Sequence, residues 1–228
     1  IEGIGLGVNP LGSLTTNNET ELRQLAEAVR KTVTDAGIKK ITKVRSALPE
    51  WQVYTRVIEV PPLSEAELAS ALSWEAEQYI PVPLAEVNLD WEVLRRPTAS
   101  APNQKMEVLL VAAPKAVVEQ RAQLLQVAGL EPIGLETEIL ATARSLVRGN
   151  DGAPLIICNL GAMGTTISIV EEGRLVFAYA VPTGGIALTR AVSQGLGLEF
   201  AQAEEYKRSY GLDESQLEGK IGRAMATV

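Results

Sequence analysis

The residues with the clearest chemical potential form a glycine-containing turn, Asn159-Leu160-Gly161-Ala162-Met163-Gly164-Thr165-Thr166, between two apolar stretches. Because glycine accepts positive φ, the backbone N–H groups of such a turn can converge on an anion, and threonine hydroxyls can contact phosphate or magnesium-bound water. Taken alone, this pattern more often marks an ordinary hairpin. The sequence has no GxxxxGK[ST] run, so a P-loop is excluded.

Two later segments could contribute to the same chemistry. Pro182-Thr183-Gly184-Gly185 leads into a predicted helix, which would place free N–H groups and the positive end of the helix dipole near one point. In Ala203-Glu204-Glu205-Tyr206-Lys207, Glu204 and Lys207 are three residues apart and share a helix face. They could form a surface ion pair or a polar ledge for a ribose and base. For each segment alone, the structural interpretation is the commoner one.

Aromatic residues gather in Trp74-Glu75-Ala76-Glu77-Gln78-Tyr79-Ile80-Pro81, with Asn88, Asp90 and Trp91 shortly after. Such a concentration is typical of a hydrophobic core or of a recognition groove. The single cysteine, Cys158, lies within a predicted buried strand, where a small apolar role without chemistry is expected.

Composition excludes several classes of protein. The 228 residues contain no histidine, so a Ser-His-Asp relay and a histidine metal site are excluded. One cysteine permits no internal disulfide, which fits a reducing compartment. A net charge of −7 argues against nucleic-acid binding. No apolar run is long enough to span a bilayer and no leader is evident, so the sequence predicts a cytosolic protein without direct membrane insertion.

The chain around these motifs alternates predicted helices and strands. Apolar residues recur every three or four positions between Thr20 and Gly37, which predicts an amphipathic helix. Strands are expected at 38–48 and 52–60, and Ser64-x-x-Glu67 is a capping box that predicts a helix to about Tyr79. Two strands at 87–94 and 107–113 are expected to pair. A helix from Pro114, a strand at 130–136 and a helix at 136–147 complete this part.

The character of the sequence changes beyond Asn150-Asp151-Gly152, a plausible boundary. Three short strands at 155–160, 165–170 and 174–181 predict a meander, and two helices follow at about 185–195 and 201–210. Together the two parts indicate layered α/β or α+β architecture.

The order of these motifs resembles the second half of the actin-like ATPase superfamily, as in FtsA and MreB. There a D-x-G turn binds phosphate, a GG turn touches the nucleotide and an AExxK helix contacts the ribose and base. The resemblance implies ATP and Mg²⁺ as cofactors. It assigns nucleotide contacts to Asn159, Gly161, Ala162, Gly164, Thr165, Gly184, Gly185, Glu204 and Lys207.

The segments TRVIEVPPLSE, WEAEQYIP, EVNLDWEVL, PTGGIALTRAVSQGLGL and AEEYKRSYGL are similar to the type IV pilus assembly protein PilM family over essentially the whole chain. This resemblance implies an α/β, actin-like (ribonuclease H-like) fold, with a first lobe at 1–150, a small subdomain inserted at about 45–94, and part of a second lobe at 151–228. It also implies that the first strands and the distal part of the second lobe are missing.

The family resemblance implies a cytoplasmic component of the pilus inner-membrane assembly platform that serves pilus biogenesis and twitching motility. Such proteins bind ATP and hold the N-terminal cytoplasmic segment of PilN in a groove of the first lobe. The residues expected to line or support this groove are Arg56, Trp74, Gln78, Tyr79, Ile80 and Asn88.

Two departures from the superfamily pattern bear on catalysis. Asn159 replaces the aspartate that would orient a magnesium-bound water, so weak or no ATPase activity is expected. Glu136 matches a helix-start glutamate that orients the attacking water in relatives, but Thr137 follows it where they usually have proline. An active ATPase or phosphotransferase of the same fold and an FtsA-like division protein are the alternatives. The final residues, GKIGRAMATV, show no membrane-targeting amphipathic helix.

Overall fold

A computed structural model describes residues 3–12, 14–98, 104–147 and 153–228. The chain forms two compact units. Unit 1 holds Ile1–Asp151 with Gly173–Leu175, and unit 2 holds Gly152–Glu172 with Val176–Val228. The predicted boundary, Asn150-Asp151-Gly152, lies outside the described residues.

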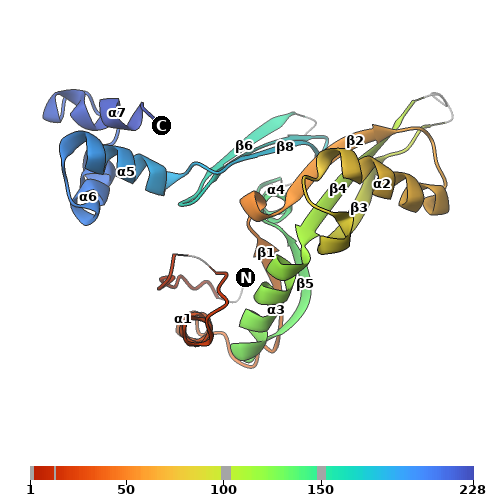
Figure 1. Cartoon of the computed structure of the whole chain (residues 1–228), viewed down its shortest axis with the longest axis horizontal. Coiled ribbons are helices and arrows are strands. Elements are labelled where there is room, and N and C mark those ends of the chain that lie inside the picture. The colour runs from red at the N-terminus through yellow and green to blue at the C-terminus, as the bar shows by residue number, and fades with distance from the viewer. Residues whose placement is uncertain (1–2, 13, 99–103, 148–152) are drawn as a thin grey trace. The chain divides into compact units, whose positions relative to one another are not determined.

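One layer of unit 1 consists of two parallel strands, β1 (Lys43–Leu48) and β5 (Glu131–Thr137), and two helices, α1 (Glu19–Asp35) and α3 (Lys115–Val127). α3 lies beside β5 and α1 beside α3 (Figure 1). Leu25 and Ala26 of α1 pack against Leu124 and Leu125 of α3. Of the strand expected at 38–48, only β1 forms.

Helix α4 (Glu138–Leu146) follows β5 directly. The Thr137 hydroxyl caps this helix by accepting the N–H of Leu140 at 3.4 Å. The predicted helix start at Glu136 is therefore wrong, because Glu136 still belongs to β5 and pairs with Ala47. The residue that opens the helix is Glu138.

The second layer of unit 1 is an antiparallel sheet of three strands in the order β2-β4-β3, covered on one face by α2 (Glu65–Tyr79). The strands are β2 (Tyr54–Val60), β3 (Val87–Arg95) and β4 (Met106–Pro114), with short 3-10 turns η1 (Glu50–Gln52) and η2 (Leu84–Glu86). The predicted capping box is confirmed, since Ser64 and Glu67 each accept a backbone N–H of the other.

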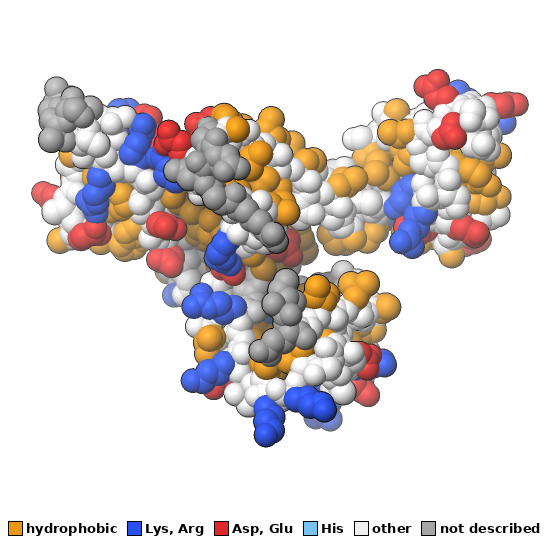
Figure 2. Space-filling view, turned by 180° about the vertical axis from the view of Figure 1, so that it is seen from behind, with side chains coloured by type: hydrophobic (Ala, Val, Ile, Leu, Met, Phe, Trp, Pro, Cys, Tyr) orange, Lys and Arg blue, Asp and Glu red, His pale blue; other side chains and the backbone are white. Residues whose placement is uncertain are grey.

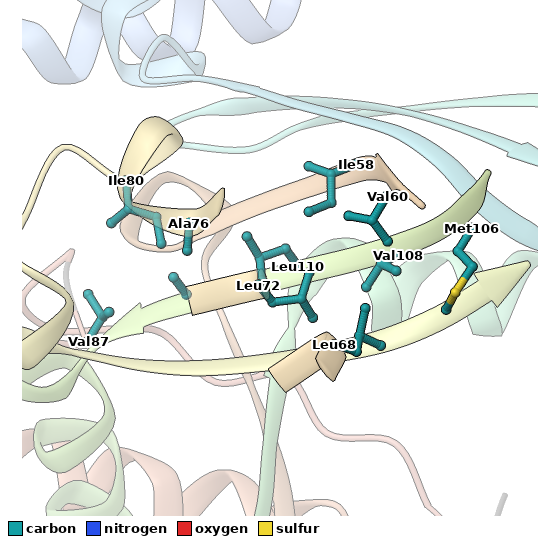
Figure 3. Packing of buried hydrophobic residues seen from close by; sticks show 11 residues of the cluster. Ile58, Val60, Leu68, Leu72, Ala76, Ile80, Val87, Met106, Val108 and Leu110 are labelled. Carbon is teal, nitrogen blue, oxygen red and sulfur yellow. The ribbon is translucent and has the colours of Figure 1, made fainter. Parts of the chain in front are cut away.

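The core between α2 and the sheet comes from alternate strand residues. Leu68 and Leu72 are fully buried and face Val108 and Leu110 of the central strand (Figure 3). The period-2 prediction for β2 is confirmed because Ile58 and Val60 enter this core while Glu59 stays exposed. The sheet reaches beyond the predicted 45–94 subdomain, since β4 is its central strand, and β1 pairs with β5 instead.

Unit 2 begins with the predicted meander, whose strands lie in the order β6-β7-β8. These are β6 (Leu155–Leu160), β7 (Thr165–Glu171) and β8 (Arg174–Val181). The helices are α5 (Gly185–Leu196), α6 (Phe200–Tyr210) and α7 (Lys220–Met225), with the turn η3 (Leu217–Gly219). α7 was not expected from the sequence. It buries Ile221 and Met225 in a cluster with Val192 and Ala203.

The expectation that Cys158 is buried is wrong, because β6 is an edge strand and its Cys158 side chain is exposed. Apolar side chains of this sheet, including Ile156, Leu160 and Tyr179, are also exposed. Figure 2 shows hydrophobic side chains on the surface of the molecule. Among the described residues, no helix combines the length and the apolar character that crossing a membrane requires.

Candidate functional site

In unit 2, the glycine turn after β6 meets the glycine pair before α5. The N–H of Gly185 donates to the carbonyl of Gly161, and the N–H of Ile186 donates to the carbonyl of Ala162, each at 2.9 Å. A Cβ on Gly184 would lie 2.4 Å from the Gly161 carbonyl oxygen, a distance that real Cβ atoms do not adopt. Gly184 is therefore needed for the close contact of two backbone segments.

These hydrogen bonds correct one prediction. The N–H groups of Gly185 and Ile186 at the start of α5 are not free, because they are used within the protein. In the described part of the chain, no backbone hydrogen bond engages the N–H groups of Ala162 and Met163, and both residues are exposed. The donors available to an anion therefore lie in the turn itself.

The third segment, on α6, joins the same cluster. The Lys207 ammonium donates to a Glu204 carboxylate oxygen at 2.6 Å, to the Thr189 hydroxyl at 2.8 Å and to the Gly185 carbonyl at 3.0 Å. An ammonium has three N–H donors, so all of them are used. Hydrogen bonds from Lys207 and Thr189 lower the pKa of Glu204. The ion-pair interpretation is confirmed, and the pair links α6 to the first turn of α5.

Thr165 and Asn159 are two further residues predicted to contact the nucleotide. The Thr165 hydroxyl donates to the Thr183 carbonyl at 2.7 Å. Asn159 lies opposite Thr166 across the β6–β7 pair. No group of three or more histidine, cysteine or acidic side chains in the described part of the chain is placed to hold a metal ion. The turn thus fits a phosphate at its free N–H groups, whereas Mg²⁺ would depend mainly on phosphate oxygens and water.

Unit 1 contains a groove of about 610 Å³ on the sheet face opposite α2. Leu109, Val111 and Ala113 of β4 lie in it beside Asn88, Asp90 and Glu92 of β3. The other lining residues come from β1, β3, α3, β5 and α4: Leu48, Trp91, Val118, Leu135, Glu136, Thr137 and Leu140. Leu48, Leu109 and Ala113 are buried at the floor of the groove, whereas Val111, Val118, Leu135 and Leu140 are half-buried. These four side chains form the apolar surface that a segment can contact.

The structure separates the residues expected to form the partner site. Asn88 lines the groove, whereas Ile80 is only 6% exposed and belongs to the core under α2. The Arg56 guanidinium lies 4.2 Å from the centre of the Tyr79 ring, on the sheet face that α2 covers. Trp74 is 67% exposed on α2, and Gln78 is also exposed. These residues do not form one surface with Asn88.

Glu136 lies in the groove and is occupied by an ion pair. Its carboxylate accepts from the Arg144 guanidinium at 2.5 Å, an interaction that raises the pKa of Arg144. The helix-start position that the prediction assigned to Glu136 is held by Glu138. Threonine is a favoured N-cap residue, so Thr137 was the sequence signal that could have identified Glu138 as the first residue of α4.

Sequence reasoning missed a cluster of charged side chains where β1 and β5 end. Arg121 of α3 is 6% exposed and donates to the Ser46 hydroxyl at 3.0 Å and to the Ala47 carbonyl at 2.7 Å. Burial raises the pKa of Glu138, and the positive charge of Arg121 opposes that shift. Burial also raises the pKa of Glu50, which is 3% exposed. No sequence spacing connects these residues.

The parallel strand pair with its antiparallel sheet and helix, together with a glycine turn that meets a helix start, defines an actin-like fold. The family model of the type IV pilus assembly protein PilM matches residues 3–219. The chain belongs to this family.

The chain is also similar to solved structures and to a curated protein. A PilM–PilN type IV pilus biogenesis complex matches with a TM-score of 0.73 and 26% identity, over 91% of this chain and 61% of that one. The ethanolamine utilization protein EutJ from Carboxydothermus hydrogenoformans has a TM-score of 0.49 and 18% identity, over 91% of this chain and 52% of its own. The cell division protein FtsA of Bacillus subtilis (strain 168) is 24% identical over 108 residues, which are 47% of this chain and 24% of FtsA. The chain therefore spans less than two thirds of each relative.

Proposed function

We propose that the chain acts as the actin-like component of the type IV pilus assembly platform and binds the N-terminal cytoplasmic segment of PilN in the groove of unit 1. The observation that carries this proposal is the match to a PilM protein in complex with PilN. A groove of about 610 Å³ with apolar lining is large enough for several side chains of an extended segment. Through this partner the protein would be held at the cytoplasmic face of the inner membrane and serve pilus biogenesis and twitching motility.

A titration tests the groove. A peptide of about the first ten residues of PilN is added to the 228-residue chain and the heat of binding is measured. Val111 lies on the groove face of β4, so Val111→Arg should weaken binding at least about tenfold by blocking the apolar surface. Ser70→Arg is the matched control, because Ser70 is exposed on α2 and outside the groove.

Trp74→Ala tests whether the peptide binds instead on α2, where Trp74 and Tyr79 are exposed. If Trp74→Ala removes binding and Val111→Arg does not, the peptide binds on α2 and the groove assignment is wrong. If the unaltered chain shows no heat of binding at a micromolar concentration, the docking function itself is rejected.

The second candidate function is nucleotide binding. Three segments of unit 2 that meet in space favour it: the glycine turn after β6, the glycine pair at the start of α5, and the Glu204–Lys207 segment of α6. The N–H groups of Ala162 and Met163 would hold phosphate, and Glu204 and Lys207 would border the ribose and base. Asn159 and Thr165 lie next to this turn and would contact magnesium-bound water. When bound, Mg²⁺ would neutralise phosphate charge. Asn159 contributes no charge, so hydrolysis would be slow or absent.

Thermal unfolding tests nucleotide binding. Millimolar ATP with Mg²⁺ should raise the unfolding temperature of the chain, since a ligand that binds only the folded state stabilises it. Asn159→Asp should make this shift depend more strongly on Mg²⁺, because it adds a carboxylate beside the turn. An unchanged unfolding temperature in both proteins would contradict nucleotide binding by this chain. Phosphate release by Asn159→Asp above that of the unaltered chain would support the ATPase alternative.

A further inference from the structure

The groove of unit 1 carries two rows of side chains of different chemistry. In the β3–β4 register, Asp90 lies opposite Val111 and Glu92 opposite Leu109. Residues directly opposite in an antiparallel pair have Cβ atoms about 5 Å apart, and residues two apart on one strand are about 7 Å apart. A polar row on β3 therefore runs beside an apolar row on β4.

The two carboxylates in this row lack basic partners, unlike their neighbours. Glu59 on β2 pairs with Lys105, and Glu107 on β4 pairs with Arg95. No described Lys or Arg side chain lies within ion-pair distance of Asp90 or Glu92, and both are exposed. An Asp90 oxygen accepts only the neighbouring backbone N–H of Trp91, at 2.9 Å.

The nearest basic side chains are paired with other carboxylates. Arg144 and Arg174 line an adjoining pocket that also includes Glu92. However, Arg144 pairs with Glu136, and Arg174 lies 3.6 Å from Glu107. Among the residues that line the groove, Glu136 is the third acidic residue, and Arg144 already neutralises it. None of the lining residues is a lysine or an arginine. Two like charges on one face of a strand disfavour each other, so a cation from outside the chain would relieve their repulsion.

We infer that the groove takes an extended partner segment in which apolar side chains alternate with at least one lysine or arginine, and that Asp90 and Glu92 bind this cation. This inference rests on the proposed docking of the PilN segment and adds the chemistry that selects it. The apolar side chains of the segment contact the half-buried Val111 and Leu140, and its cation faces the carboxylates of β3. Period-2 alternation in the segment matches the period-2 alternation of the sheet.

Charge removal gives the first test, with the PilN N-terminal peptide as the probe. Asp90→Asn with Glu92→Gln should weaken binding about fivefold, the effect of losing partly exposed ion pairs. Binding to the unaltered chain should weaken as salt is raised from low to high ionic strength. Glu27→Gln with Glu77→Gln is the matched control, since both residues are exposed and lie outside the groove. Binding by this control should stay within about twofold.

Charge reversal gives the decisive test. Asp90→Lys with Glu92→Lys should weaken binding by more than about tenfold, because a repulsive pair replaces an attractive one. A peptide in which the lysines and arginines are changed one at a time to glutamate should restore binding to this variant at one position. Circular dichroism should show unchanged secondary structure, since both residues are exposed.

The outcomes separate the inference from the function on which it rests. If the peptide binds the unaltered chain and neither charge removal nor charge reversal changes its dissociation constant, the inference is overturned and the docking function stands. If the peptide does not bind the unaltered chain at all, the docking function and this inference are both overturned.

Discussion

The ammonium of Lys207 lies 2.6 Å from a carboxylate oxygen of Glu204 and 3.0 Å from the carbonyl oxygen of Gly185. This ammonium therefore joins the helix α6 to the glycine pair that opens α5. The side chain of Lys207 is only 16% exposed, so water replaces it poorly when it is removed. The cluster has a structural role before any nucleotide is considered.

Lys207→Met should lower the free energy of unfolding by about 2 kcal/mol, because Glu204 and the Gly185 carbonyl lose a charged donor in a partly buried site. Arg208→Met is the control: Arg208 is 4.0 Å from Glu204, and its side chain is 78% exposed. Its loss should cost less than about 0.5 kcal/mol. Urea unfolding measures both, and equal midpoints for the two variants would contradict the structural role of Lys207.

Glu204 should make stability depend on pH in the acid range. Hydrogen bonds from Lys207 and Thr189 lower its pKa in the folded state, so its stabilisation is present above the unfolded pKa of about 4. The stabilisation is lost as pH falls through the folded pKa. Glu204→Gln should therefore lose less stability than the unaltered chain between pH 6 and pH 3. Glu205→Gln, an exposed neighbour, should retain the original pH dependence in the same unfolding series.

Glu50 should make stability depend on pH in the opposite direction to Glu204. Burial raises its pKa in the folded state, and its Oε2 atom makes no hydrogen bond in the described part of the protein. Its favourable contribution is thus present below the unfolded pKa of about 4 and is lost as pH rises through the folded pKa. Glu50→Gln should stabilise the protein at pH 7 by on the order of 1 kcal/mol, since it removes a buried charge. Calorimetry at pH 4 and pH 7 checks this, and a gain confined to pH 4 would show the sign to be wrong.

Gly184→Ala should be poorly tolerated. The added Cβ would lie 2.4 Å from the Gly161 carbonyl oxygen and 2.7 Å from the Gly164 nitrogen, and both are backbone atoms. Separating the two segments should cost about 1–3 kcal/mol, as overpacking usually does. Gly185→Ala is the matched control, because its nearest neighbour is the movable Lys207 Nζ at 3.4 Å. If thermal unfolding finds the two variants equally stable, the close contact of the turns is not a constraint.

Elements with strong local signals were predictable from the sequence. The capping box of Ser64 and Glu67 starts a helix wherever it occurs, because it satisfies free N–H groups locally. The alternation in β2 follows from period-2 spacing, and the meander of β6, β7 and β8 follows from short apolar runs separated by glycine-containing turns. The start of α4 was misplaced because the cap at Thr137 was not recognised as the stronger signal.

The candidate sites were less predictable, since they depend on contacts between distant segments. The motifs identified Gly184 and Lys207 as site residues. They did not predict that the first N–H groups of α5 donate to the carbonyls of Gly161 and Ala162. Asn88 was assigned to a groove together with Trp74, although the two lie on different faces of one layer. Period-2 alternation separates Asn88 from Val87 and Leu89 on β3, but which face of the sheet α2 covers depends on packing between distant segments.

The sequence by itself determined the family, the order of helices and strands, and the exclusion of histidine chemistry, because these depend on residue types and short-range periodicity. Only the tertiary structure decided that β4 lies between β2 and β3, and so put Asp90 and Glu92 beside an apolar row. It also decided that Lys207 is engaged within the protein and that Glu50 and Arg121 are buried. The physical reason is that burial, hydrogen-bond partners and the side-chain pKa depend on which distant segments surround a residue.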